Sequence, residues 1–71
     1  MLNFGGAILA LKAGERVTRA GWNGKGMWLA LQRPNHSIMS LPYLYIRTVE
    51  GELVPWVASQ ADILAEDWDV V

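Results

Sequence analysis

The sequence predicts an α+β fold: a small, mostly antiparallel sheet with an N-terminal helix and a short C-terminal helix. A helical repeat of apolar residues lies near the start of the chain, and a helix-capping pattern lies near its end. Short strand-like runs fill most of the space between them, and another follows the second helix. The length of 71 residues allows one domain, so we expect residues 1–71 to fold together.

The first element is a helix that begins after Asn3, whose side chain can accept hydrogen bonds from the free amides of the first turn. Gly14 is placed to end it, since glycine adopts the left-handed conformation without a steric penalty. Leu9 lies about 100° away from the apolar stripe, so it extends the core face or contacts another subunit. The stripe itself comprises Phe4, Ala7, Ile8 and Leu11.

The strand-like segments alternate with turns. They are residues 15–19, 27–32, 41–48, 52–57 and 68–71. Asn23-Gly24 is a strong hairpin signal inside the glycine-rich turn of residues 20–26. Pro55 indicates that its strand lies at a sheet edge or a bulge, since proline cannot donate to a neighbouring strand. Ser59 and Asp62 have the spacing of a capping box, which predicts the start of the second helix.

Composition excludes several kinds of protein. The chain has no cysteine, so disulfides and thiolate metal sites are absent, and His36 alone cannot form a multi-histidine zinc site. A net charge of −1 argues against general binding to DNA or RNA. No apolar run approaches the roughly 20 residues of a membrane-spanning helix, and the N-terminus lacks the basic start of a signal peptide. We therefore expect a cytoplasmic protein without a membrane partner.

The charges are unevenly distributed along the chain. All six Lys and Arg side chains lie in residues 1–47, whereas six of the seven acidic side chains lie in residues 48–71. This split indicates either pairing between the two halves or between subunits, or an anion site built from the first half. A small chain buries only about 60% of its unfolded surface, so the high apolar fraction of 52% favours a homo-oligomer.

Residues for catalysis are few. There is no cysteine nucleophile, and His36 stands alone in a polar loop. Glu66, Asp67 and Asp69 are acidic neighbours around a tryptophan, but proximity in sequence does not supply the raised pKa that a paired-carboxylate mechanism needs. We expect no enzymatic activity and no cofactor.

Binding is better supported, because four tryptophans are present. In the glycine-rich turn, Trp22 offers a face on which a base can stack, and Lys25 adds positive charge beside amides that can cradle an anion. The alternative is a plain hairpin turn whose tryptophan packs on the core. Trp56 precedes the second helix, whose start either attracts an anion or is simply capped by Ser59 and Asp62.

The remaining aromatic residues indicate packing. Trp28 and Trp68 lie in strand-like segments, where a position in the core is the more frequent role. Tyr43 and Tyr45 alternate along one segment, so they share a face at the edge of the core or at a subunit interface.

Four stretches resemble the phage Thoeris anti-defence type two family, in order and at compatible spacing over nearly the whole chain. One is interrupted, with Phe4-Gly5 followed by LKAG at residues 11–14, and one is short, residues 41–46, LPYLYI. The two longest uninterrupted stretches are also the more specific: residues 19–27, RAGWNGKGM, and residues 54–68, VPWVASQADILAEDW.

This resemblance implies a small homo-oligomer, typically a tetramer, in the cytoplasm of the bacterial host. It implies a protein that binds cyclic ADP-ribose isomers made by a defence sensor and holds them without cleavage. Some relatives are linked to cyclic oligonucleotides. The implied pocket residues are Trp22, Asn23, Met27 or Trp28, Trp56, Ser59 and Asp62. Two other functions stay open at this point: a protein-interaction module and a phosphodiesterase.

Overall fold

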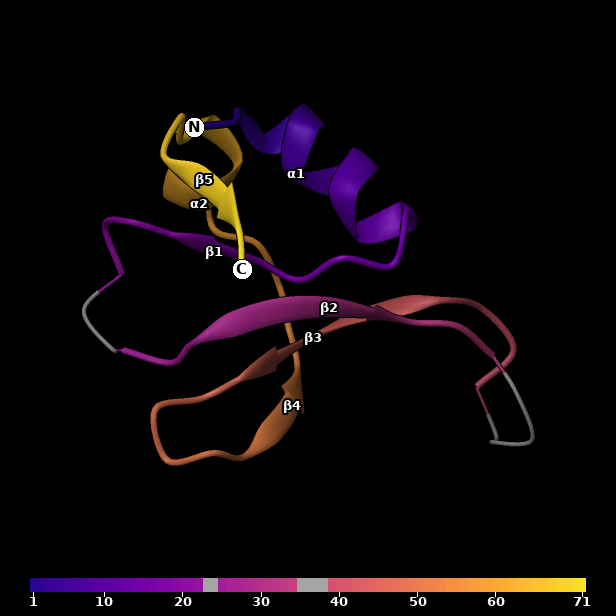
Figure 1. Cartoon of the computed structure of the whole chain (residues 1–71). Helices are drawn as coiled ribbons and strands as arrows, with labels where there is room; N and C mark the ends of the chain where they lie inside the picture. The colour runs from indigo at the N-terminus through magenta and orange to yellow at the C-terminus, as the bar shows by residue number, and fades with distance from the viewer. Residues whose placement is uncertain (23–24, 35–38) are drawn as a thin grey trace.

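The computed structural model describes residues 1–22, 25–34 and 39–71, and it confirms the α+β class and the order of every expected element in these ranges (Figure 1). The predicted Asn23-Gly24 turn and His36 lie outside the described residues. The elements are α1 (Phe4–Lys12), β1 (Val17–Arg19), β2 (Trp28–Gln32), β3 (Tyr43–Arg47), β4 (Leu53–Pro55), α2 (Gln60–Leu64) and β5 (Trp68–Val70).

Both helices begin where their capping residues predict. The Asn3 side chain accepts a hydrogen bond from the Gly6 amide at 2.9 Å, and Gly14 follows α1 with a φ of +93°. At α2, the hydroxyl of Ser59 accepts from the Asp62 amide at 3.1 Å, while the Asp62 carboxylate accepts from the Ser59 amide at 3.3 Å. The capping box therefore forms with Asp in the position that Glu usually occupies.

The five strands form one antiparallel sheet in the order β4-β3-β2-β1-β5. Its central pairs are consecutive in sequence, but β5 comes from the far end of the chain and pairs with β1, with Arg19 opposite Trp68. The short strand β4 lies at the opposite edge, which confirms the position that Pro55 predicts. Leu2 also bridges to Trp68, so both ends of the described chain lie beside α2 and β5 (Figure 1).

The core lies between α1 and one face of the sheet. Its fully or nearly buried members are Ala7, Leu11, Val17, Leu29, Ile46 and Trp68. Leu9 is 70% exposed, so the idea that it widens the core is wrong and a subunit contact stays a prediction. Trp68 confirms its expected core position, but Trp28 does not, because it alternates with Leu29 and so lies on the other face.

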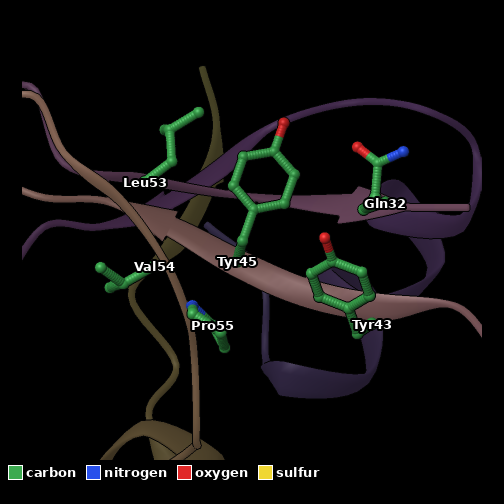
Figure 2. Close-up of a pocket in the computed structure, with 6 residues that line it drawn as sticks. All are labelled: Gln32, Tyr43, Tyr45, Leu53, Val54 and Pro55. Atoms are coloured by element: carbon green, nitrogen blue, oxygen red, sulfur yellow. The ribbon is translucent and has the colours of Figure 1, made fainter. Parts of the chain in front are cut away.

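That other face is not covered by either helix in the described part of the chain (Figure 1). Tyr43 and Tyr45 share it, as predicted, and Trp28 contacts Tyr45 with ring centroids 6.1 Å apart. Figure 2 shows Gln32, Tyr45 and Leu53 projecting to the same side of the sheet, around a shallow cavity of about 170 Å³. Across the described ranges, the structure contains no helix that is both long and apolar enough to cross a membrane.

Candidate functional site

Three of the four tryptophans meet at one end of the molecule, in what we call the tryptophan cluster (Trp22, Trp56, Trp68 and Phe4). Trp68 is its fully buried centre. The ring centroids of Trp22 and Trp56 lie 5.4 and 6.2 Å from that of Trp68, nearly perpendicular to it at 81° and 84°. Edge-to-face contacts of this kind are favourable, and they leave Trp22 and Trp56 half-buried at the surface.

The main chain fixes Trp68 in this central position. Its amide and carbonyl are hydrogen-bonded to Leu2, at 3.0 and 2.6 Å, and its indole Nε1 donates to the Asp62 carbonyl at 3.1 Å. Pairing of β5 with β1 then places the residues around Trp68 beside Arg19. The cluster thus depends on contacts among the N-terminus, β1, α2 and β5.

A polar network, formed by Arg19, Trp22, Ser59, Asp62 and Asp67, borders the tryptophan cluster. Arg19 is its centre: Nη1 donates to Asp62 Oδ1 and Nε donates to Asp67 Oδ1, both at 2.8 Å. Trp22 Nε1 donates to Asp62 Oδ1 at 3.2 Å, and the Ser59 hydroxyl donates to Asp62 Oδ2 at 2.9 Å. The aromatic and polar parts of the site are therefore joined through Trp22.

Ionisation of the two carboxylates is favoured by this network. Burial raises the pKa of Asp62, but hydrogen bonds from Arg19, Ser59 and Trp22 together outweigh burial and hold that pKa below its ordinary value. The hydrogen bond from Arg19 is the main reason that the pKa of Asp67 is also lowered. Hydrogen bonds to Asp67 and Asp62 raise the pKa of Arg19. At neutral pH the network thus carries one positive and two negative charges.

Comparison with known proteins identifies the family of this chain. Residues 2–71 match the model of the "Thoeris anti-defense 2-like domain". A curated relative, "Thoeris anti-defense 2" from Bacillus phage SP01, is 36% identical over 84 aligned positions, which cover 99% of this chain and 94% of the relative. The chain belongs to the Thoeris anti-defence 2 family. The resemblance seen in the sequence is therefore confirmed.

The structure brings together four of the residues that the resemblance to the Thoeris anti-defence 2 family implies for the pocket. They are Trp22, Trp56, Ser59 and Asp62, all in the tryptophan cluster or the polar network. Ser59 and Asp62 cap α2, as the simpler alternative held, and they also serve the network. In the cap, the amide of each residue donates to the side chain of the other.

The other predicted binding residues of this Thoeris anti-defence 2 family member are placed differently. Met27 packs against the core from the half-buried position before β2, and Lys25 is exposed in the glycine-rich turn. Trp28 is separated from the tryptophan cluster, on the uncovered face of the sheet, with the Arg16 guanidinium carbon 4.8 Å from its ring centre. Asn23 lies outside the described residues.

Sequence reasoning missed Arg19 and Asp67, which organise the polar network. The uneven distribution of charge was the available signal, since it allowed pairing between a basic first half and an acidic second half. Such pairing occurs within one chain, where Arg19 forms ion pairs with both Asp62 and Asp67. The sequence did not indicate which basic side chain would meet which acidic one.

Two cavities in the described structure lie away from these residues. One is the shallow cavity on the uncovered sheet face, and the other, of about 310 Å³, lies between α1 and the sheet beside Leu11, Leu31 and Leu44. Neither is lined by the tryptophan cluster or the polar network. In a single chain the candidate site of this Thoeris anti-defence 2 family member consists of side chains at the surface, among which Trp22 and Trp56 are half-buried.

Proposed function

We propose that this protein inhibits Thoeris immunity in the cytoplasm of the bacterial host. It binds a cyclic ADP-ribose-type signalling nucleotide and holds it without cleaving it. Membership of the Thoeris anti-defence 2 family supports the inhibition. The tryptophan cluster is the observation that supports nucleotide binding, because Trp22 and Trp56 pack on the buried Trp68 yet stay partly exposed. Stacking of a base on an aromatic ring contributes about 1–3 kcal/mol.

The charges of the site suggest how such a ligand lies. Arg19, Asp62 and Asp67 together carry a net negative charge, so this network disfavours a pyrophosphate. It is compatible with the uncharged base, which it does not repel. The exposed Lys25 side chain and the amides of Lys25 and Gly26 are the groups for the pyrophosphate. The base then stacks on Trp22, and the phosphates face away from Asp62 and Asp67.

Storage without cleavage agrees with the chemistry of the two carboxylates. A general acid needs a pKa raised toward neutrality, whereas the pKa values of Asp62 and Asp67 are lowered. Both carboxylates are also occupied by donors from Arg19. A carboxylate held in this way is a weak proton donor and a weak base, so it serves binding better than catalysis.

A thermal-shift panel tests the proposal. The purified protein is melted with cyclic ADP-ribose, its linkage isomers, linear ADP-ribose and cyclic dinucleotides. At a ligand concentration 100 times the Kd, linkage stabilises the folded state by about 2.7 kcal/mol, so we expect Tm to rise by roughly 10 °C or more. The ligand is then released by heat and identified by mass spectrometry, and we expect it intact.

The panel also separates the alternatives. An unchanged Tm with every cyclic ADP-ribose isomer would contradict the proposed ligand class. A rise with cyclic dinucleotides alone would assign the protein to that class of signal. Recovery of linear ADP-ribose from a cyclic isomer would indicate hydrolysis and would overturn the storage mechanism.

We also propose that the protein is a homo-oligomer, with a tetramer as the expected form. Its accessible surface of 4959 Å² exceeds the roughly 4,400 Å² expected for a compact monomer of 7.9 kDa. Leu9, Leu53, Val57 and Leu64 are each at least 60% exposed. A second chain would also close the half-open tryptophan cluster. Light scattering should give about four times 7.9 kDa, and a mass near 7.9 kDa would contradict assembly.

A protein-interaction module is the second candidate function. The uncovered face of the sheet favours it, because Trp28, Tyr45 and Leu53 all lie there. Aromatic anchors of this kind are common at the centre of protein interfaces. Capture of one host protein in a stoichiometric complex, together with a Tm insensitive to the nucleotide panel, would favour this function over nucleotide storage.

A further inference from the structure

The carboxylate of Asp62 is fully engaged within the chain. Its Oδ1 accepts from Arg19 Nη1 and Trp22 Nε1, and its Oδ2 accepts from the hydroxyl and the amide of Ser59. A carboxylate offers about four lone-pair positions, so these four donors occupy it. Asp62 is therefore engaged by the protein itself, and one of its contacts fixes the direction in which the Trp22 indole N–H points.

Asp67 fixes the main chain at Trp22, at the opposite end of that residue from its indole N–H. Its Oδ2 accepts from the Gly21 amide at 2.7 Å, immediately before Trp22, while its Oδ1 holds Arg19 Nε. The backbone approaches so closely that a Cβ at Gly21 would lie 3.0 Å from Asp67 Oδ2. A side chain at position 21 would push against the Asp67 carboxylate, and the main chain that carries Trp22 is tied to Asp67.

We infer that Asp67 is a positioning residue, which holds the Trp22 ring ready for a base to stack. It acts along two paths: directly on the main chain at Gly21, and through Arg19 and Asp62 on the indole N–H. Its own carboxylate would repel an anionic ligand, which argues against direct contact. This inference rests on the proposed nucleotide binding, and it adds a residue that touches no ligand.

Preorganisation is the physical benefit of this arrangement. A tryptophan that is free to rotate loses conformational entropy when a ligand fixes it, and that loss weakens binding. Here the side chains of Arg19 and Asp67 are only 18% and 26% exposed, so their ion pair is partly shielded from water. It can therefore fix the ring in the ligand-free protein.

The test compares Asp67→Asn with Asp69→Asn in the full chain. Asp67→Asn keeps the size and an acceptor for Gly21 but removes the charge that holds Arg19. The control carboxylate, Asp69, is half-exposed and lies 3.5 Å from the terminal amino group. Loss of one hydrogen bond to a charged group should weaken binding of a cyclic ADP-ribose isomer about tenfold in Asp67→Asn. The control should bind as the wild type does.

A second readout reports on Trp22 itself. In the free protein, the NMR resonance of the Trp22 indole N–H, assigned by its loss in Trp22→Phe, should shift and exchange faster with solvent in Asp67→Asn. The Trp56 indole should not respond. Asp67→Glu restores the charge and should recover part of both effects. If Asp67→Asn fails to fold, Arg19→Lys carries the same two readouts, since one ammonium cannot reproduce the guanidinium bridge.

The outcomes are distinct. Unchanged affinity together with an unchanged Trp22 resonance would overturn the inference. Weaker binding with an unchanged Trp22 resonance would also overturn it, because Asp67 would then act by another route. If the wild type binds no cyclic nucleotide, the proposed function fails, but the Trp22 resonance in the free protein still decides whether Asp67 positions the ring.

Discussion

Replacing Trp68 by alanine is expected to remove a large part of the free energy of unfolding. The side chain is fully buried and contacts Phe4, Trp22 and Trp56, so its removal leaves a large cavity. Such a change costs about 3–5 kcal/mol, and it also removes the indole donor to the Asp62 carbonyl. A domain of this length is stable by only roughly 4–10 kcal/mol. Urea denaturation followed by circular dichroism measures the loss.

Trp28→Ala is the matched control for this prediction. Trp28 is half-buried on the uncovered face and contacts Arg16 and Tyr45, so we expect a loss of about 1–2 kcal/mol. Both variants are compared with the wild type at equal protomer concentration, because self-association would add to the measured free energy of unfolding. A Trp68→Ala protein that unfolds within 1 kcal/mol of the control would show that the cluster is not the centre of the fold.

Replacing Trp22 by alanine is expected to remove most of the nucleotide affinity while the fold persists. Stacking of one base on an aromatic ring contributes about 1–3 kcal/mol to binding. Its loss corresponds to an affinity that is roughly fivefold to 150-fold weaker. The fold should persist because Trp22 is only half-buried. The contacts of Trp68 with Phe4 and Trp56 do not involve Trp22 and remain in the variant. Calorimetric titration with the cyclic ADP-ribose isomer that raises Tm most measures the affinity, and circular dichroism checks the fold.

Two further variants make the result specific. Trp22→Phe keeps an aromatic face but loses the donor to Asp62, so its affinity should lie between those of the wild type and Trp22→Ala. Tyr43→Ala removes a half-buried aromatic ring from the uncovered sheet face and should leave affinity unchanged. Wild-type affinity in Trp22→Ala would exclude Trp22 from the binding site.

The sequence predicted the local parts of the fold well because their determinants are local. Asn3 and Ser59 accept hydrogen bonds from residues three positions later, so a short stretch of sequence contains both partners. Pro55 likewise indicates an edge strand by its own chemistry. Alternation did not fix the face of Trp28, because a strand with apolar residues on both sides does not show which side meets the helix.

The site was predicted only in part for a related reason. Ser59 and Asp62 belong to a local motif, and Trp22 and Trp56 are conspicuous residues in stretches that resemble a known family. Arg19 is 43 and 48 positions from its two carboxylate partners, so its role depends on β5 pairing with β1. Several strand orders are compatible with the same series of strands, and each brings different charged residues together.

The pairing of Leu2 with Trp68 has a consequence for the order of assembly. It closes a loop that spans nearly the whole described chain, and contacts between such distant residues slow folding because the chain must search a large volume to make them. During synthesis, Trp22 and Trp56 emerge before Trp68 is available to receive them. The aromatic surface that we propose for the ligand is therefore completed late, once Trp68 has paired with Leu2.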